Sequence, residues 1–466
     1  MRFLLVVTEA DISLLQKHLP AKDLGFEIRL DTFRQKPDFK GMRAATEHPL
    51  LATFRSKEHC GQGETSARAS MGWGWREEAL AAGFDAVDVE LDEPGLPEKL
   101  ATIGKGGAQS VLSHHEKEPG KDLLAAIEQG KGLRPDVLKI IGTGSGLQDF
   151  WIQKQAYRDA GSQRLVFFFM GQEFQATRLL SLTYGAPFTF AIPDHQVQVA
   201  PGVPPLGFLQ DVFGAHTPQR VENLFAVLGS PIGHSQSPRF HNPMLRSKDA
   251  KSLFIALPAG LGELQKVIAL FPELRGMAVT KPLKEEAFSF ANSFFGEGVA
   301  ELGAVNTLIR RNKTWKGANT DYEAMRQLLS PYGEETRVRV LGFGGLGKAV
   351  VQASLELGHH VEICNRSPNR LGKVPVGAKV IDWAKRHRPG PEVLIQATSA
   401  GMAPYSEVSP MDEIPATVHT LVETIYNPIE TRLMKLAHSQ GIHTLDGSVL
   451  FKQQAKIQNA YFQTVI

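Results

Sequence analysis

The stretch Val338-Arg339-Val340-Leu341-Gly342-Phe343-Gly344-Gly345-Leu346-Gly347-Lys348-Ala349 decides the fold of the C-terminal part of the chain. Residues 338–341 have the character of a buried strand, and an apolar helical pattern follows the glycines. Glycines permit a tight turn and let backbone N–H groups approach a pyrophosphate at a helix N-terminus. This order of strand, glycines and helix predicts a Rossmann-like dinucleotide-binding domain, with a purely structural glycine turn as the alternative. The residues expected to bind the dinucleotide here are Gly342, Gly344, Gly345 and Gly347.

The next strand-like run, His360–Cys364, ends in Asn365, Arg366 and Ser367, with Arg370 nearby. An NAD site usually has an acidic residue at this point to bind the ribose 2′-hydroxyl, whereas arginine suits a 2′-phosphate. The guanidinium is planar and permanently charged, which matches phosphate oxygens. The segment therefore predicts NADP(H), and a solvated surface arginine is the alternative.

The first ~215 residues contain eight short runs rich in Val, Ile, Leu and Phe, separated by segments of helix length. Such runs are typical of parallel strands that are buried on both faces. Eight β/α units predict a TIM (β/α)8 barrel, and an open doubly wound sheet is the alternative. The runs are Phe3–Thr8, Phe26–Asp31, Leu51–Arg55, Ala86–Leu91, Ser110–His115, Val137–Ile141, Leu165–Met170 and Phe188–Ile192.

Polar residues occur in or beside the C-terminal ends of several of these runs. In a core strand, each charge would be costly without a partner. In a barrel the C-terminal ends of the strands meet around one mouth, so these residues would converge there. They are Glu27, Arg29, Arg55, Glu90, His115 and Lys139.

The Pro/Gly-rich stretch at 200–205 and the polar segment at 215–220 mark a boundary after the barrel. We expect an α/β fold made of a barrel over 1–217, a smaller α/β domain over 222–325 and a Rossmann-like domain over 326–446. A C-terminal helix over 447–466 should complete the smaller domain.

Lys plus Arg (51) nearly balances Asp plus Glu (49), so no overall charge favours nucleic acid or an anionic membrane. No apolar run approaches the ~20 residues of a membrane span, and the first residues are interpreted as a strand and not as a signal peptide. Cys60 and Cys364 are far apart and fit no metal-ligand spacing. We expect a cytoplasmic protein that acts on small molecules and uses no metal.

Several strings in the C-terminal half resemble motifs of shikimate dehydrogenases, and the resemblance covers essentially Phe225–Ile466. The strings are GSPIGHSQSP at 229–238, VTKPLK at 279–284, GAVNT at 303–307, GANTD at 317–321, ATSAGM at 397–402 and YNP at 426–428. Reduction of a ketone needs a hydride and a proton for the nascent alkoxide. The resemblance implies that Lys284 donates this proton and that Asp321 fixes its position; a plain ion pair is the alternative.

The same resemblance assigns further binding residues. Ser235 and Ser237 would bind the substrate carboxylate, because hydroxyl groups both donate and accept hydrogen bonds. The implied contacts to the ring hydroxyls come from Thr280, Asn306, Gln453 and Tyr426, and further cofactor contacts from Thr398 and Gly447.

The barrel resembles a type I dehydroquinase through EIRLD at 27–31, TFRS at 53–56, DVEL at 88–91, SHH at 113–115 and DVLKI at 136–140. The resemblance implies that Lys139 forms an imine with the substrate ketone, since desolvation on an apolar strand can lower a lysine pKa and free the amine. His115 would transfer the proton and Glu90 would orient the imidazole. His114 faces the opposite way on a strand. The implied substrate contacts are Glu27, Arg29 and Arg55, with Arg178 on the carboxylate.

The chain departs from both family patterns. Val199 and Val203 replace a Ser and a Gln near the last barrel strand, and Ala278 and Gln396 each replace an Asn of the dehydrogenase motifs. We expect dehydration of 3-dehydroquinate to 3-dehydroshikimate, followed by NADPH-dependent reduction to shikimate. The alternatives are a monofunctional shikimate or quinate dehydrogenase whose barrel only binds a metabolite, a bifunctional enzyme that prefers quinate, and a non-catalytic scaffold.

Overall fold

The computed structural model describes residues 2–17, 23–64, 68–194, 200–214, 220–296 and 298–466, without the side chains of residues 68, 69 and 370. Val199 therefore lies outside the described residues. The chain divides into two compact units. The first comprises Met1–Ala259 and Gln265–Glu273, and the second comprises Gly260–Leu264 and Leu274–Ile466.

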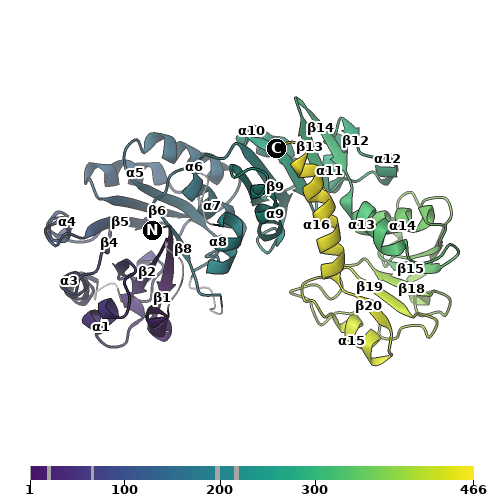
Figure 1. Cartoon of the computed structure of the whole chain (residues 1–466), viewed down its shortest axis with the longest axis horizontal. Helices are drawn as coiled ribbons and strands as arrows, with labels where there is room; N and C mark the ends of the chain where they lie inside the picture. The colour runs from purple at the N-terminus through teal and green to yellow at the C-terminus, as the bar shows by residue number, and fades with distance from the viewer. Residues whose placement is uncertain (1, 18–22, 65–67, 195–199, 215–219, 297) are drawn as a thin grey trace. The chain divides into compact units, whose positions relative to one another are not determined.

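The first unit begins with eight parallel strands in the order β7-β6-β5-β4-β3-β2-β1-β8, which form a nearly closed barrel (Figure 1). All eight predicted runs form strands, with ends that differ from the prediction by at most two residues. The barrel prediction is confirmed. The strands are β1 (Phe3–Val7), β2 (Leu24–Arg29), β3 (Leu50–Thr53), β4 (Ala86–Glu90), β5 (Gln109–His115), β6 (Val137–Thr143), β7 (Leu165–Met170) and β8 (Thr189–Ala191).

Most strand side chains are buried because helices cover the outside and side chains, many of them apolar, fill the inside. Leu4, Val111 and Val166, for example, are each at most 1% exposed and belong to one apolar cluster. The α-helices are α1 (Phe39–Ala44), α3 (Trp73–Ala81), α4 (Leu96–Lys105), α5 (Leu123–Gly132), α6 (Gln148–Asp159), α7 (Gln175–Thr183) and α8 (Leu206–Phe213). The 3-10 and π-helical segments are η1 (Glu9–Gln16), η2 (Leu30–Thr32), η3 (Lys57–His59), η4 (Arg68–Gly72) and η5 (Gln172–Phe174).

A parallel strand pair with a crossing helix completes the first unit. β9 (Asn223–Gly229) pairs with β10 (Ser252–Pro258), and α9 (Ser237–Arg246) connects them. The amide of Asn242 on α9 donates to the carbonyl of Phe254 and accepts from its N–H, both at 2.8 Å. This buried amide fixes the helix to the strand, because a buried polar group left unpaired would be costly.

The second unit contains a small α/β part. β13 forms antiparallel pairs with β11 and β14, and β12 lies parallel to β14. The C-terminal helix α16 (Gly447–Gln463) packs here, and its Gln458 donates to the carbonyl of Asn306 and to the hydroxyl of Thr307. The other elements are α10 (Leu264–Leu270, mostly in the first unit), β11 (Leu274–Val279), α11 (Lys284–Phe290), β12 (Ser293–Phe294), α12 (Gly298–Leu302), β13 (Thr307–Arg311), β14 (Thr314–Ala318) and α13 (Thr320–Leu329).

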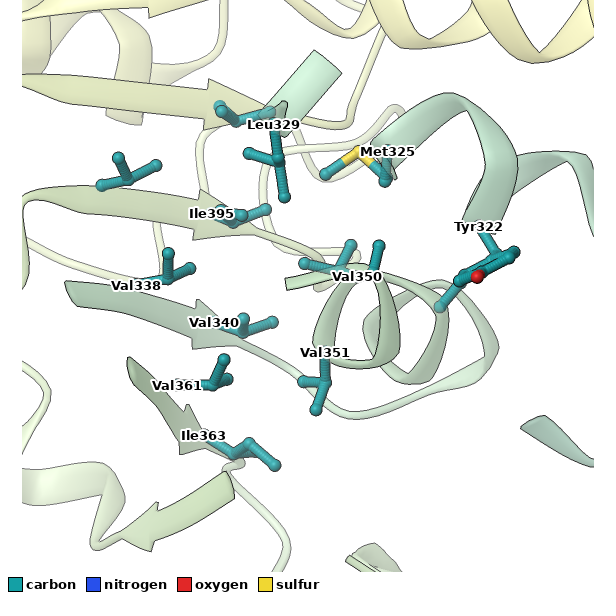
Figure 2. Packing of buried hydrophobic residues seen from close by; sticks show 14 of the residues in the cluster. Tyr322, Met325, Leu329, Val338, Val340, Val350, Val351, Val361, Ile363 and Ile395 are labelled. Atoms are coloured by element: carbon teal, nitrogen blue, oxygen red, sulfur yellow. The ribbon is translucent and has the colours of Figure 1, made fainter. Parts of the chain in front are cut away.

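Six parallel strands in the order β17-β16-β15-β18-β19-β20 form the Rossmann-like part, as predicted. Figure 2 shows its core, where Val338 and Val340 of the first strand face Val350 and Val351 of the following helix. None of the described helices is long and apolar enough to pass through a lipid bilayer. The elements are β15 (Arg337–Leu341), α14 (Gly345–Glu356), β16 (His360–Cys364), η6 (Pro368–Arg370), β17 (Ala378–Ile381), η7 (Trp383–Lys385), β18 (Val393–Gln396), β19 (Thr420–Glu423), α15 (Arg432–Ser439) and β20 (His443–Leu445).

Candidate active sites

Lys139 lies on β6 inside the barrel and is only 4% exposed. Its Nζ lies 3.2 Å from Oδ2 of Asp88 and 3.7 Å from Oε1 of Glu27, and 4.5 Å above the ring of Phe190. Burial lowers the pKa of Lys139, and the nearby charge of Arg55 lowers it further, although the two carboxylates act in the opposite direction. The environment therefore favours a free amine more than water does.

Asp88 connects Lys139 to the rest of this site, and sequence reasoning assigned it no role. Its carboxylate accepts from Arg55 at 2.9 Å and from the hydroxyl of Ser113 at 2.7 Å. Burial raises the pKa of Asp88, but the charges of Arg55 and Lys139 outweigh it and lower the value to about 2. The sequence did contain one indication that Asp88 belongs to the site. Asp88 and Glu90 are two residues apart on β4, so their side chains lie on the same face of the strand.

His115 and Glu90 come together as predicted. Nδ1 of His115 lies 3.5 Å from Oε1 of Glu90, which is 1% exposed and also pairs with Arg55. Burial lowers the pKa of His115 well below its usual value, and the positive charges of Arg55 and Lys139 add to this effect. The imidazole is therefore neutral near pH 7 and can accept a proton.

A second imidazole shares the Glu90 carboxylate, which the sequence alone did not indicate. His59, at the end of η3, is 8% exposed and places its Nδ1 3.7 Å from Oε2 of Glu90. Its Nε2 lies 3.2 Å from the carboxylate of Asp92. Glu90 is thus flanked by two histidines, and only the one on β5 belongs to a motif.

Three further residues predicted for the barrel site, Glu27, Arg29 and Arg178, each contact different partners. Glu27 accepts from the hydroxyl of Thr53 at 3.0 Å, while Arg29 donates two 2.9 Å hydrogen bonds to Asp31. Arg178, buried on α7, lies 4.1 Å over the ring of Phe168, and burial lowers its pKa to about 9.

Among the described residues, no carboxylate pairs with Arg178, which donates to the carbonyl of Pro201 at 3.4 Å. A buried guanidinium of this kind can bind the carboxylate of a substrate. Val203 is 3% exposed and packs in one apolar cluster with Phe168 and Phe190. The barrel site therefore has an apolar side where the family pattern has a polar group.

In the second unit, Nζ of Lys284 lies 2.6 Å from Oδ2 of Asp321, as predicted. The carbonyl of Lys284, at the start of α11, accepts the N–H of Val305 at 3.0 Å, which ties the VTKPLK and GAVNT segments together. A Cβ added to Gly345 would lie 3.3 Å from Cδ of Lys284. The ion pair therefore borders the glycine loop.

Asn306 forms the centre of a buried polar cluster. Its amide nitrogen donates to the hydroxyl of Thr320 at 3.0 Å, and that hydroxyl lies 3.1 Å from Oε1 of Gln454. The structure brings Gln454 to this cluster, whereas the predicted Gln453 donates to Gln327. The reason is helical phase, since Gln454 and Gln458 are four residues apart and face the same way from α16.

Two other predicted residues lie apart from these contacts. Thr280 follows β11, and its carbonyl accepts the N–H of Leu283 at 2.9 Å. Tyr426 is 38% exposed, and its ring centroid lies 5.1 Å from that of Phe451.

The glycine loop combines one tight backbone contact with open space at the start of α14. Gly342 has φ of +94°, and a Cβ on Gly347 would lie 2.3 Å from the carbonyl oxygen of Gly342, so only glycine fits there. A Cβ on Gly344, by contrast, would meet nothing within 4 Å. Helix α14 begins at Gly345 beside this open space, and its first N–H groups have no partner within the helix.

The loops that follow β16 and β18 form hydrogen bonds next to the glycine loop. Asn365 accepts the N–H of Phe343 at 3.2 Å and donates to the carbonyl of Ser367 at 2.8 Å, while Arg366 is exposed. The side chain of Arg370 lies outside the described residues. Gln396, which replaces the usual Asn, accepts 2.9 Å hydrogen bonds from the N–H and the hydroxyl of Thr398.

Gly447 begins α16 under a tight constraint, because a Cβ there would lie 2.2 Å from the carbonyl oxygen of Ile425. Ala278 lies at the end of β11, paired with Thr307.

In the first unit, the N–H of Ser235 donates to the carbonyl of Ile232 at 2.9 Å. Ser237 begins α9, and its N–H donates to the hydroxyl of Ser235 at 3.3 Å.

Comparison with known proteins identifies both parts of the chain. Residues 227–308 match the shikimate dehydrogenase substrate binding domain, and residues 8–217 match the type I 3-dehydroquinase family. A shikimate dehydrogenase (NADP(+)) from Synechocystis is 31% identical over 254 residues, which cover 50% of this chain and 87% of the relative. The chain belongs to the shikimate dehydrogenase family.

The same chain also carries the barrel that matches the type I 3-dehydroquinase family. A bifunctional 3-dehydroquinate dehydratase/shikimate dehydrogenase from Arabidopsis thaliana is 28% identical over 474 residues, covering 94% of this chain and 77% of the relative. A solved dehydroquinate dehydratase and shikimate dehydrogenase from S. pombe is 20% identical, covers 100% of this chain and 98% of its own, and has a TM-score of 0.40.

Proposed function

We propose that this chain catalyses two consecutive reactions of the shikimate pathway. The barrel dehydrates 3-dehydroquinate to 3-dehydroshikimate, and the dehydrogenase part reduces 3-dehydroshikimate to shikimate with NADPH. The observation that carries the proposal is that one chain holds two paired lysines in different settings. Lys139 is buried next to Asp88, and Lys284 is paired with Asp321 at the glycine loop.

In the barrel, the amine of Lys139 attacks the substrate ketone; the ketone oxygen takes one proton from this amine and one from solvent and leaves as water, which gives an iminium ion. The iminium withdraws electrons, so a proton can leave the adjacent carbon to neutral His115. The electron pair of that C–H bond forms the new C=C bond as the hydroxyl group departs, and His115 returns the proton to this hydroxyl so that it leaves as water. Hydrolysis of the imine then frees the product and Lys139. Glu90 holds the imidazole in place.

Substrate recognition in the barrel rests on the surrounding charges. Arg178 pairs with the substrate carboxylate, because it is buried and its contacts with Phe168 and Pro201 leave it able to bind an anion. Glu27, Arg29 and Arg55 lie around the remaining polar groups. The apolar Val203 removes one hydrogen-bonding group, which typically costs ~1–3 kcal/mol of binding.

In the dehydrogenase, NADPH held by the glycine loop would supply a hydride to the carbonyl carbon of the substrate. The ammonium group of Lys284 gives a proton to the carbonyl oxygen, and Asp321 keeps it in position. Ser235 and Ser237 bind the carboxylate. The ring hydroxyls contact Thr280, Asn306, Gln454 and Tyr426, with Gln454 in the place first expected of Gln453.

We also propose that this chain prefers NADP(H) over NAD(H). Arg366 follows β16 and is exposed, so it is free to bind a 2′-phosphate together with Arg370. The similar Synechocystis enzyme is named for NADP(+). The glycine loop, Asn365, Ser367, Thr398 and Gly447 would bind the rest of the dinucleotide.

We assign the dehydratase to residues 1–217, shikimate binding to 222–325 with 447–466, and cofactor binding to 326–446.

We also propose a cytosolic location, because the two cysteines, Cys60 and Cys364, are both unpaired, as is usual in a reducing compartment.

A coupled assay that starts from 3-dehydroquinate and NADPH tests the proposal. Lys139→Ala should stop only the first step, and Lys284→Ala should let 3-dehydroshikimate accumulate. Borohydride should trap a reduced substrate adduct on Lys139 by mass spectrometry. The exposed Lys57→Ala serves as a matched control that changes neither step. Dehydration by Lys139→Ala would refute the dehydratase half and leave a dehydrogenase with a metabolite-binding barrel.

A further inference from the structure

An acidic residue of the barrel contacts the loop that precedes α9. Glu173 lies in η5, directly after β7, and its Oε2 accepts the N–H of Ile232 at 2.7 Å. Its Oε1 accepts the N–H of Gly233 at 2.9 Å. One carboxylate therefore binds two successive backbone N–H groups, and hydrogen bonds to a charged acceptor are stronger than neutral ones. All three residues belong to the first unit.

The backbones of η5 and this loop also approach each other closely. The side-chain amide of Gln172 donates to the carbonyl of Gly233 at 3.1 Å. A Cβ on Gly233 would lie 2.6 Å from the carbonyl oxygen of Gln172, so the contact requires glycine. Ile232 is 5% exposed. These contacts hold the backbone N–H groups of Ile232 and Gly233 against η5 of the barrel.

The Ile232–Gly233 peptide group, whose N–H is bound by Glu173, also contacts Ser235 through its carbonyl. The carbonyl of Ile232 accepts the N–H of Ser235 at 2.9 Å, and the hydroxyl of Ser235 accepts the N–H of Ser237 at 3.3 Å. The turn from 232 to 235 lies between β9 and α9, outside either regular element. A displacement of the Ile232–Gly233 peptide would therefore move both serines.

We infer that Glu173, a residue of the dehydroquinase barrel, is a positioning residue for substrate binding by the dehydrogenase. Its carboxylate holds the loop so that the hydroxyl groups of Ser235 and Ser237 are preorganised for the substrate carboxylate. This inference rests on the proposed role of the two serines. The barrel then contributes to the second reaction without touching its substrate.

Full-length variants test the inference by separating KM from kcat. Glu173→Ala leaves two N–H groups without their acceptor, and we expect the KM for 3-dehydroshikimate to rise about ten-fold, equivalent to ~1.4 kcal/mol. The dehydrogenase kcat, the KM for NADPH and the dehydratase activity should change less than two-fold. Glu173→Gln keeps one acceptor oxygen and should give an intermediate KM.

Asp211→Asn is the matched control, because the carboxylate of Asp211 on the barrel helix α8 pairs with Arg239 of α9, while its backbone carbonyl, which accepts from Arg246 of α9, is kept in the variant. It should leave the KM for 3-dehydroshikimate unchanged. If Asp211→Asn raises this KM as much as Glu173→Ala does, general loosening is the cause and the inference is wrong. Glu173 would likewise have no positioning role if Glu173→Ala lowers both activities equally and Glu173→Gln restores neither.

Ser235→Ala separates the inference from the proposed function. A raised KM for Ser235→Ala, with wild-type values for both Glu173 variants, would overturn the inference alone. An unchanged KM for Ser235→Ala would overturn the proposed carboxylate site, and the inference with it.

Discussion

The amine of Lys139 on β6 lies 3.2 Å from the carboxylate of Asp88 on β4, two strands away in the barrel. Both side chains are almost completely buried, so the protein surrounds an ion pair with little water. Asp88 also binds Arg55, which leaves Lys139 only part of its negative charge. Burial lowers the pKa of Lys139 and the charge of Arg55 adds to this effect, so the pKa stays lowered although the lysine is paired.

The first prediction concerns the ionisation of Lys139. Asp88 raises the pKa of Lys139, so Asp88→Asn should lower it further and leave more free amine near pH 7. Competitive labelling with acetic anhydride, followed across pH by mass spectrometry, should show the midpoint for Lys139 moving to lower pH. Exposed Lys57 provides the internal reference. A midpoint that stays or rises would show that Asp88 does not control this amine.

The second prediction concerns the carboxylate between the two histidines. Glu90→Gln removes the charge that orients His115, so the dehydratase kcat should fall about 100-fold, within the range for general acid–base catalysis. His59→Gln should lower kcat less than ten-fold, because this ring is expected only to help hold Glu90. Reduction of 3-dehydroshikimate by the same samples is the control. An equal loss in both variants would mean that His59 takes part in the proton transfer itself.

The third prediction concerns the ion pair of the dehydrogenase. Lys284→Met and Asp321→Asn should each lower kcat for reduction by about 100-fold. Because the two groups act as one unit, the double variant should be little worse than Lys284→Met alone. Dehydratase activity should stay unchanged in all three variants. Fully multiplicative losses would show that the two residues act independently.

The fourth prediction concerns cofactor choice. Arg366→Ala should raise the KM for NADPH about 10- to 100-fold and leave the KM for NADH within two-fold, because only NADPH carries the 2′-phosphate. Lys373→Ala removes an exposed positive charge seven residues along the chain and should change neither value. Equal effects on both cofactors would assign Arg366 to the shared part of the dinucleotide.

The sequence predicted the barrel strands because each one is apolar along nearly its whole length. Lys139 and His115 stand out as ionisable residues in such runs, and their catalytic roles were inferred from the resemblance to type I dehydroquinases. Asp88 also lies in such a run, but its contacts with Lys139 and Arg55 in other runs depend on strand register. His59 lies outside the predicted runs, and its approach to Glu90 depends on the path of a short loop.

The position of Gln453 outside the Asn306 cluster has a similar origin. Two adjacent glutamines on a helix face directions about 100° apart, so a motif shifted by one residue points to the other side of the helix. Helical phase relative to Gln458 identifies Gln454, but only once the partner of Gln458 is known. The Glu173 contact was beyond sequence reasoning, because it joins segments that belong to two different family patterns.

The close contact between Gly342 and Gly347 in the glycine loop has a consequence for mutations at this position. A methyl group at Gly347 would collide with the carbonyl oxygen of Gly342, so α14 would have to retreat from the strand that precedes it. The barrel would be unaffected. A Gly347→Ala substitution would thus impair the reduction and leave the dehydration intact, so 3-dehydroshikimate would be released into solution. An assay of the dehydration alone would not detect this substitution.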